Sequence, residues 1–311
     1  PLTPEGSIPD CYHPTEPYSA MVLGPGEVFS GTPCCHMVEV DVVGRSATHR
    51  RLDCPWIEGM GRYAVARVGD YVCVFGGCEV DTEPVDTLRL FHLPSETWTV
   101  QHRQEGEEWP QARVDACAVC VDGSLTVLGG SDRDPMHDMW VYNMAMNKWR
   151  LVREESEEGS DGERDSEGET TPLEMPCESA QGGVVVGDTF HVASKDRESG
   201  RDLHYTYTHD SGWESRALPD FTYLPINSEW EAVSLNGDLY VTSLNGGDWD
   251  RLHTMDVETG DWRVNGCDHE LDFEFTGACA IAPDTVFGGY HYGVPKVYFG
   301  VDCKEVIPVT L

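Results

Sequence analysis

The sequence has little positive charge and no long hydrophobic stretch. Of its 311 residues, 21 are lysine or arginine and 55 are aspartate or glutamate, so the formal net charge is −34. Because phosphate backbones and anionic lipids attract cationic surfaces, this balance argues against nucleic acid and membranes as partners. No apolar run approaches the ~18–20 residues of a membrane span. The acidity favours solubility and attraction to basic partners, with adaptation to a salty medium as the alternative.

The sequence also shows no phosphate-binding loop and no repeated metal-binding cysteine pattern, and its first residues are not expected to be a secretory leader. Residues 1–17 have neither a basic start nor an apolar stretch, so we expect a cytoplasmic protein with reduced thiols. The glycine-containing segments match neither GxGxxG nor GK[ST]. A single CxxC pair, Cys117 and Cys120, lies in an alternating run, where residues three apart point to opposite faces. We therefore expect no metal and no cofactor, and we interpret most of the 12 cysteines as small apolar core residues.

What the sequence does contain is a recurring apolar strand that ends in a glycine pair. "YVCVFGG" ends in Gly76-Gly77, "LTVLGG" in Gly129-Gly130 and "TVFGG" in Gly288-Gly289. Weaker copies without the pair at the expected place lie at 24–32, 187–196 and 237–247. A glycine at the end of a strand indicates a place where a side chain would crowd a neighbouring backbone. The pairs are therefore predicted to serve packing and turning.

A second marker is a tryptophan that follows a turn-like segment. Trp98, Trp149, Trp213 and Trp262 are separated by 51, 64 and 49 residues, and the longest interval contains an acidic insertion. Seven residues before these tryptophans stand, in order, Phe91, Tyr142, Thr206 and Met255. The spacing predicts units of about fifty residues, each with four short strands and a tryptophan at the start of the fourth.

This combination resembles the kelch repeat, in which an apolar strand closes on a glycine doublet and an aromatic residue precedes a tryptophan by seven positions. The units with Gly76-Gly77 and Gly129-Gly130 match best, and Arg62 and Arg113 stand upstream of them as in the family. As a period, the resemblance covers Ser19 to Leu311. It implies a β-propeller, because small twisted sheets that cannot bury both faces alone cover one another when stacked around an axis.

The predicted fold is therefore all-β: a single-domain, six-bladed β-propeller of four-stranded antiparallel blades. The blades are placed at about 19–57, 62–109, 113–155, 179–218, 228–266 and 275–311. Residues 1–18 form an N-terminal extension that either adds a strand or crosses a face. Residues 153–175 are acidic and rich in serine and glycine, so they are expected to be a disordered insertion. Ser160 and Ser166 each have an acid three residues on, which suits acid-directed kinases; a neutral loop expansion is the alternative.

Binding is expected on the face that carries the longer loops, since function concentrates on variable loops held by a rigid scaffold. These loops join the second strand to the third and one blade to the next. Aromatic residues inside a charged rim would suit a basic peptide, although Trp109 and Trp249 would equally suit packing against blade edges. The candidate partner-binding residues are Asp81, Glu83, Trp109, Asp132, Asp134, Asp196, Arg197, Asp248, Trp249, Asp250, Tyr290 and Tyr292.

The expected function is a non-catalytic protein-interaction scaffold that binds a basic protein or peptide. The first alternative is a propeller enzyme of the copper-radical galactose oxidase or sialic-acid epimerase type. Residues 202–210 and 290–293 offer tyrosine and histidine, but neither run matches the oxidase motifs. The second alternative is a carbohydrate-binding propeller, which would expose aromatic residues beside carboxamides. The sequence does not predict the oligomeric state.

Overall fold

In the computed structural model, every regular element of the described residues is a β-strand, and these residues contain no helix. The described residues are 10–13, 18–24, 34–41, 46–54, 60–79, 82–153, 172–180, 182–208, 210–218, 230–235, 238–243, 251–257, 259–266, 278–282, 285–291, 294–299 and 305–308. The all-β prediction is thus confirmed.

The strands form four-stranded antiparallel sheets, each built from one continuous stretch of chain. The first sheet contains β1 (Asp10–His13), β2 (Tyr18–Gly24), β3 (Cys34–Asp41) and β4 (Ser46–Leu52). The second contains β6 (Ala64–Val68), β7 (Tyr71–Phe75), β9 (Leu88–His92) and β10 (Thr97–Gln101). The third contains β11 (Cys117–Val121), β12 (Ser124–Leu128), β15 (Met139–Asn143) and β16 (Lys148–Leu151).

The remaining sheets repeat this pattern. The fourth contains β17 (Val184–Val186), β18 (Thr189–Lys195), β19 (Asp202–Thr208) and β20 (Gly212–Ala217). The fifth contains β21 (Trp230–Leu235), β22 (Asp238–Ser243), β23 (Arg251–Asp256) and β24 (Trp262–Gly266). The sixth contains β25 (Ala278–Ala282), β26 (Thr285–His291), β27 (Val294–Phe299) and β28 (Glu305–Pro308). Two short ribbons pair β5 (Met60–Gly61) with β8 (Cys78–Glu79) and β13 (Ser131–Asp132) with β14 (Asp134–Pro135).

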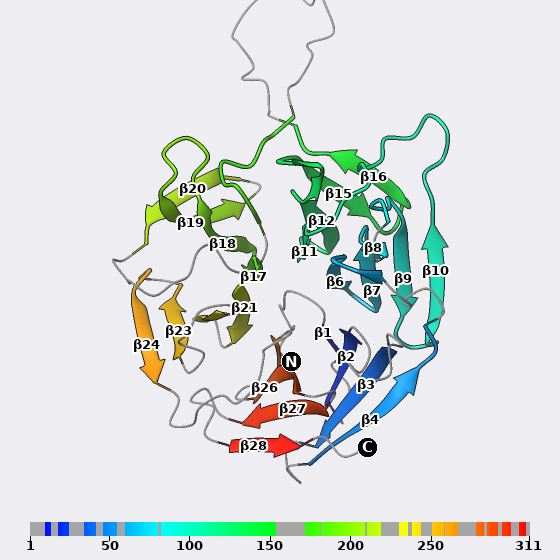
Figure 1. Cartoon of the computed structure of the whole chain (residues 1–311), viewed down its shortest axis with the longest axis vertical. Helices are drawn as coiled ribbons and strands as arrows, with labels where there is room; N and C mark the ends of the chain where they lie inside the picture. The colour runs from blue at the N-terminus through cyan, green and yellow to red at the C-terminus, as the bar shows by residue number, and fades with distance from the viewer. Residues whose placement is uncertain are drawn as a thin grey trace, which may run out of the picture.

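Successive sheets lie side by side through their first strands. β6 contacts β11, β11 contacts β17, β17 contacts β21, and β21 contacts β25. The last sheet also lies against the first, because β25 contacts β1 and β28 contacts β4. Figure 1 shows the sheets arranged around a common centre, with β4, β10, β24 and β28 at the periphery.

The segment 1–18, for which two roles were open, contributes a strand. β1 pairs antiparallel with β2, with Tyr12 opposite Ala20. The first sheet therefore starts at Asp10, upstream of the boundary placed at residue 19, and ends at Leu52.

The core consists of apolar layers between neighbouring sheets. Alternate residues of one strand enter different layers: Ala64 and Ala66 of β6 pack against the third sheet, whereas Val65 packs toward the first. In the same way Cys117 lies in the layer between the third and fourth sheets, while Cys120 packs against the layer shared with the second. The sequences of these inner strands are nearly continuous apolar runs, because the strands are buried on both faces. The opposite orientation of the CxxC cysteines is confirmed.

The tryptophans at the fourth strands join this packing. Trp98 stands opposite Phe91 and Trp149 stands opposite Tyr142, at the predicted spacing. Trp149 also contacts Phe75 of the preceding sheet, with ring centroids 5.2 Å apart.

In the fourth sheet the partner of the tryptophan differs from the one expected. Trp213 stands opposite Tyr207, six residues earlier, and not opposite Thr206. The β19–β20 hairpin is shorter by one residue, so the aromatic pair survives while its spacing in the sequence changes. In the fifth sheet Trp262 stands opposite Met255, at the spacing of seven.

One glycine pair does not end its strand. β26 continues through Gly288 and Gly289 to His291, and its pairing with β27 shifts in register between Gly288 and Tyr290. The prediction that each pair terminates a strand is therefore wrong for this sheet. A bulge absorbs the extra residue and lets pairing resume beyond it.

Candidate protein-binding face

The longer connections of the second, third and fourth sheets lie at the same end of their strands, because the strands of each meander alternate in direction. We call this end the loop face and define it by the described residues among 76–87, 102–116, 129–138, 172–183 and 195–202. Backbone hydrogen bonds link its segments: Gly77 N–H donates to the Arg113 carbonyl at 2.9 Å, and Met175 N–H donates to the His137 carbonyl at 2.8 Å. The face is thus a set of loops bonded to one another.

The glycine pair of the second sheet provides the space for one of these crossings. Gly76 and Gly77 have φ of 71° and 88°, and residues other than glycine rarely adopt such backbone conformations. A Cβ on Gly76 would lie 2.4 Å from the Arg113 carbonyl oxygen, and one on Gly77 would lie 2.8 Å from that of Gly61. Each added Cβ would clash with the carbonyl oxygen that it faces. The pair therefore lets the chain that leads into the third sheet pass directly over the end of β7.

The third sheet repeats this arrangement. Gly129 and Gly130 have φ of 60° and 97°. A Cβ on Gly130 would lie 2.7 Å from the Val114 carbonyl oxygen, while Gly129 faces the side chain of Met175. The predicted packing role of both pairs fits these contacts.

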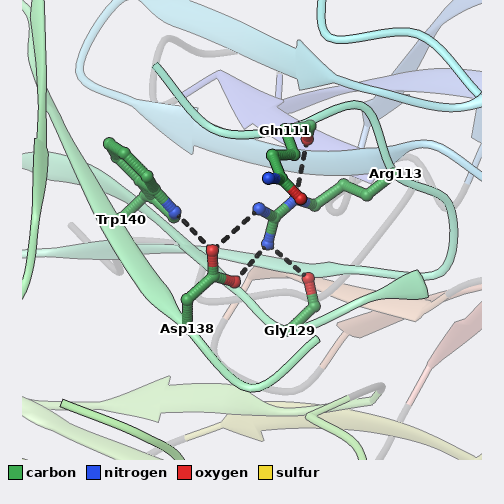
Figure 2. A network of polar contacts seen from close by, with 5 residues as sticks. All are labelled: Gln111, Arg113, Gly129, Asp138 and Trp140. Atoms are coloured by element: carbon green, nitrogen blue, oxygen red, sulfur yellow. Dashed lines mark hydrogen bonds and ion pairs between the residues drawn. The ribbon is translucent and has the colours of Figure 1, made fainter. Parts of the chain in front are cut away.

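A buried arginine joins the same crossing segments. Arg113 is 1% exposed and its guanidinium donates to the Gly129 carbonyl at 2.8 Å and to both carboxylate oxygens of Asp138 at 2.6 and 3.0 Å. Its Nε donates to the Gln111 carbonyl at 3.0 Å. Trp140 Nε1 donates to Asp138 at 2.7 Å, so the carboxylate is shared between two donors (Figure 2).

This network fixes the ionised form of Asp138. Burial alone would raise the pKa of this carboxyl, but the hydrogen bonds and charge of Arg113 and the bond from Trp140 outweigh it, so the pKa lies below its usual value. With its donors supplied by the protein, Asp138 holds the loops together and offers little to a ligand. Sequence reasoning noted Arg113 but missed Asp138, since a single aspartate before a strand carries no distinctive signal.

Three more exposed arginines on or beside the loop face are also paired. Arg133 donates to Glu83 at 3.2 Å, Arg197 to Glu174 at 2.8 Å and Arg153 to Glu108 at 2.9 Å. Arg62, next to this face, pairs with Asp115. The Arg133–Glu83 ion pair contributes little to stability, because the two side chains are 80% and 76% exposed and water screens their charges. Each pair joins a loop to a neighbouring segment and neutralises one cation of the face.

Two of the predicted acids have no such partner within the described residues. Asp132 and Asp134 flank Arg133 in the β13–β14 ribbon, where Arg133 has a φ of 64° and makes the tight turn. Within the described ranges, neither carboxylate accepts a hydrogen bond or pairs with a cation. The hairpin therefore carries two unpaired carboxylates, with Asp134 exposed and Asp132 half-buried.

The other predicted site residues have different surroundings. Asp196 accepts hydrogen bonds from Ser199 and from the Tyr205 hydroxyl, and these bonds lower the pKa of Asp196 to about 2. Arg197 is occupied by Glu174 and by the Met175 carbonyl. Both residues thus stabilise the β18–β19 connection.

Trp109 is not an exposed anchor. It is 6% exposed, its Nε1 donates to the Asp86 carbonyl at 2.6 Å, and its ring lies edge-on to Trp149 with centroids 6.0 Å apart. The packing alternative therefore describes this residue. A tryptophan within a charged loop predicts exposure only if the loop does not return over a sheet, and here it does.

Several predicted residues cannot be placed on this face. Asp81, Asp248, Trp249, Asp250 and Tyr292 lie outside the described residues. Tyr290 lies in β26, opposite Pro295, but its side chain is not described. Ser160 and Ser166 also lie outside the described residues, whereas the ends of that insertion are joined by the bridge between Arg153 and Pro172.

The described part of the chain does not assemble a metal centre or a membrane helix. No three histidine, cysteine or acidic side chains in the described ranges gather as metal ligands. Those ranges likewise contain no helix suited to crossing a membrane.

Comparison with known proteins identifies one of the units. Residues 112–154, which contain β11, β12, β15 and β16, match the family model of the Kelch motif. This segment is a kelch motif. Its Arg113, glycine pair, Tyr142 and Trp149 make contacts that hold the third sheet to its neighbours. No curated protein matches the chain.

Proposed function

We propose that the chain forms a closed, six-bladed kelch propeller that binds a basic segment of a partner protein through its loop face, without catalysis. The contacts of β25 with β1 and of β28 with β4 support closure of the ring. The four-stranded sheets and the Kelch motif support the propeller type.

The binding role is carried by the charge of the loop face. Its paired arginines join the loops into one scaffold, and the carboxylates of Asp132 and Asp134 are left for an outside cation. A lysine- or arginine-rich segment complements such a surface and would be steered toward it by the net charge of −34.

The proposal is tested with a fluorescent arginine–glycine repeat peptide and the intact chain. The variant Asp132→Asn/Asp134→Asn should weaken binding by about tenfold, since each lost rim charge contributes roughly 0.2–1 kcal/mol. The matched control is Asp70→Asn/Asp188→Asn, which removes the same charge from exposed turns at the opposite end of the sheets. Fluorescence anisotropy at low and high salt measures the affinities.

We expect the control to bind like the unchanged protein and the affinity of both to fall as salt rises. Equal weakening by the two double variants would mean that the peptide senses net charge alone and would refute the loop-face site. Binding that ignores salt would refute the ionic basis of the proposal.

A further inference from the structure

The outermost strand of the second sheet differs from its counterparts. β10 has the sequence TWTVQ, with no charged residue and no proline. The other outermost strands contain Arg50 and Arg51 in β4, Lys148 and Arg150 in β16, Glu214 and Arg216 in β20, Arg263 in β24, and Glu305 and Pro308 in β28. Charges and proline on edge strands prevent pairing with other chains. β10 lacks this protection.

This edge also exposes apolar and β-branched side chains. Val100 is 42% exposed and is one of two large hydrophobic residues exposed in the described part of the chain. Thr97 and Thr99 are exposed as well, and Trp98 is half-buried. In Figure 1, β10 lies at the periphery with no described strand beyond it.

We propose that β10 pairs antiparallel with β10 of a second copy of this chain, about a two-fold axis at Thr99. In this register Trp98 lies opposite Val100 of the second copy, and Thr97 lies opposite Gln101. Aromatic–β-branched and threonine–threonine pairs are among the favourable cross-strand combinations, so the strand is complementary to itself. The pairing covers Val100 and closes as a two-fold dimer rather than a filament.

The flanking charges fit the same register. Glu96 precedes the strand, His102 and Arg103 follow it, and all three are exposed. Antiparallel pairing at Thr99 places Glu96 opposite His102 of the second copy and beside its Arg103. This complementarity at both ends offsets part of the repulsion between two chains of charge −34. Strand β10 lies outside the loop face, which the dimer reaches only through His102 and Arg103 at its border, and the dimer does not depend on the function proposed there.

Sedimentation velocity over a wide concentration range tests the dimer. The unchanged protein should be dimeric at high concentration, and Thr99→Lys should raise the dimer dissociation constant by about tenfold or more, because it places two like charges opposite each other. Thr48→Lys is the matched control: it adds the same charge at an exposed threonine of another outermost strand, β4, and should leave the dimer intact. A monomer at every concentration, or equal effects of the two variants, would overturn the proposal.

A charge reversal separates dimer contacts from folding effects. Glu96→Lys should weaken the dimer, and adding Arg103→Glu should restore it. Within one chain these residues lie at opposite ends of the strand, about 20 Å apart, so they can compensate each other only across the two copies. Failure of the second change to restore the dimer would exclude this register.

Discussion

At the scale of single residues, the glycine pairs are determined by the backbone that crosses them. Gly76 faces a carbonyl oxygen of the chain that enters the next sheet, and Gly130 faces one of the chain that enters its own sheet. Both oxygens accept backbone hydrogen bonds. Backbone cannot rotate away as a side chain can, so alanine is too large at these sites.

Gly76→Ala is therefore expected to destabilise the protein by at least about 3 kcal/mol, from the strained φ and the clash with Arg113 together. Gly69→Ala is the matched control: Gly69 has a φ of 58° but no atom within 4 Å of its added Cβ, so only the backbone strain of about 1 kcal/mol applies. Urea unfolding followed by circular dichroism measures both. Equal losses would show that φ alone selects glycine at position 76.

At the scale of elements, the fourth sheet has two unlike faces. Phe190, Val192 and Tyr205 pack in the apolar layer against the third sheet. On the opposite face His191 and His204 are buried, with 3.2 Å between His191 Nδ1 and His204 Nε2. Burial lowers the pKa of His191 to about 4 and that of His204 to about 3, and the nearby Arg216 acts in the same direction.

This histidine pair should make the protein less stable in mild acid. Unfolded histidines take up protons below pH 6.5, whereas the folded pair resists protonation down to about pH 4 and 3, so stability is complete above pH 6.5 and falls as pH decreases through that range. Between pH 7.5 and 5 we expect a loss of roughly 2–4 kcal/mol in the free energy of unfolding.

Urea unfolding of His204→Phe at both pH values is the direct comparison, and the variant should retain only about half of the pH-dependent loss. Asp138 and Asp196 do not interfere, because their pKa values lie below the usual value and their contributions are lost only at lower pH. An unchanged pH dependence in the variant would show that other groups cause the loss.

The sequence predicts elements better than it predicts their surroundings. Strand positions and the packing of the glycine pairs follow from local patterns, because chain geometry and steric limits are local. The partner of Trp213 and the burial of Trp109 depend on a hairpin length and on a loop that returns over a sheet. The bonds of Asp138 join segments 25 residues apart, which no local pattern encodes. The unpaired carboxylates of Asp132 and Asp134 follow from the tight turn at Arg133.

At the scale of the whole molecule, neighbouring sheets are held by packing between complete meanders. Each four-stranded sheet consists of consecutive strands, and no described strand of one end of the chain joins a sheet of the other end. The first and last sheets nevertheless lie in contact through β1 with β25 and β4 with β28. A linker that runs from β28 to β1 would therefore connect two neighbouring sheets and leave the strand order of each unchanged.

A circular permutant should accordingly fold. A short glycine–serine linker joins the original ends, and the new ends are placed between Arg153 and Pro172, whose bridge lies at the base of the insertion. We expect a β-type circular dichroism spectrum and one cooperative unfolding transition. A second permutant, opened within the β18 strand, should lose both, since it interrupts a sheet. Unfolding of the first permutant would contradict the adjacency of the first and last sheets.

The formation of each sheet from consecutive strands also affects how the protein can fold during synthesis. A ribosome releases the amino end first, and each meander here spans only 31 to 43 residues from its first strand to its last, so none waits for a strand encoded far downstream. Assembly during translation can thus advance one sheet at a time, with each new meander docking on the finished one before it.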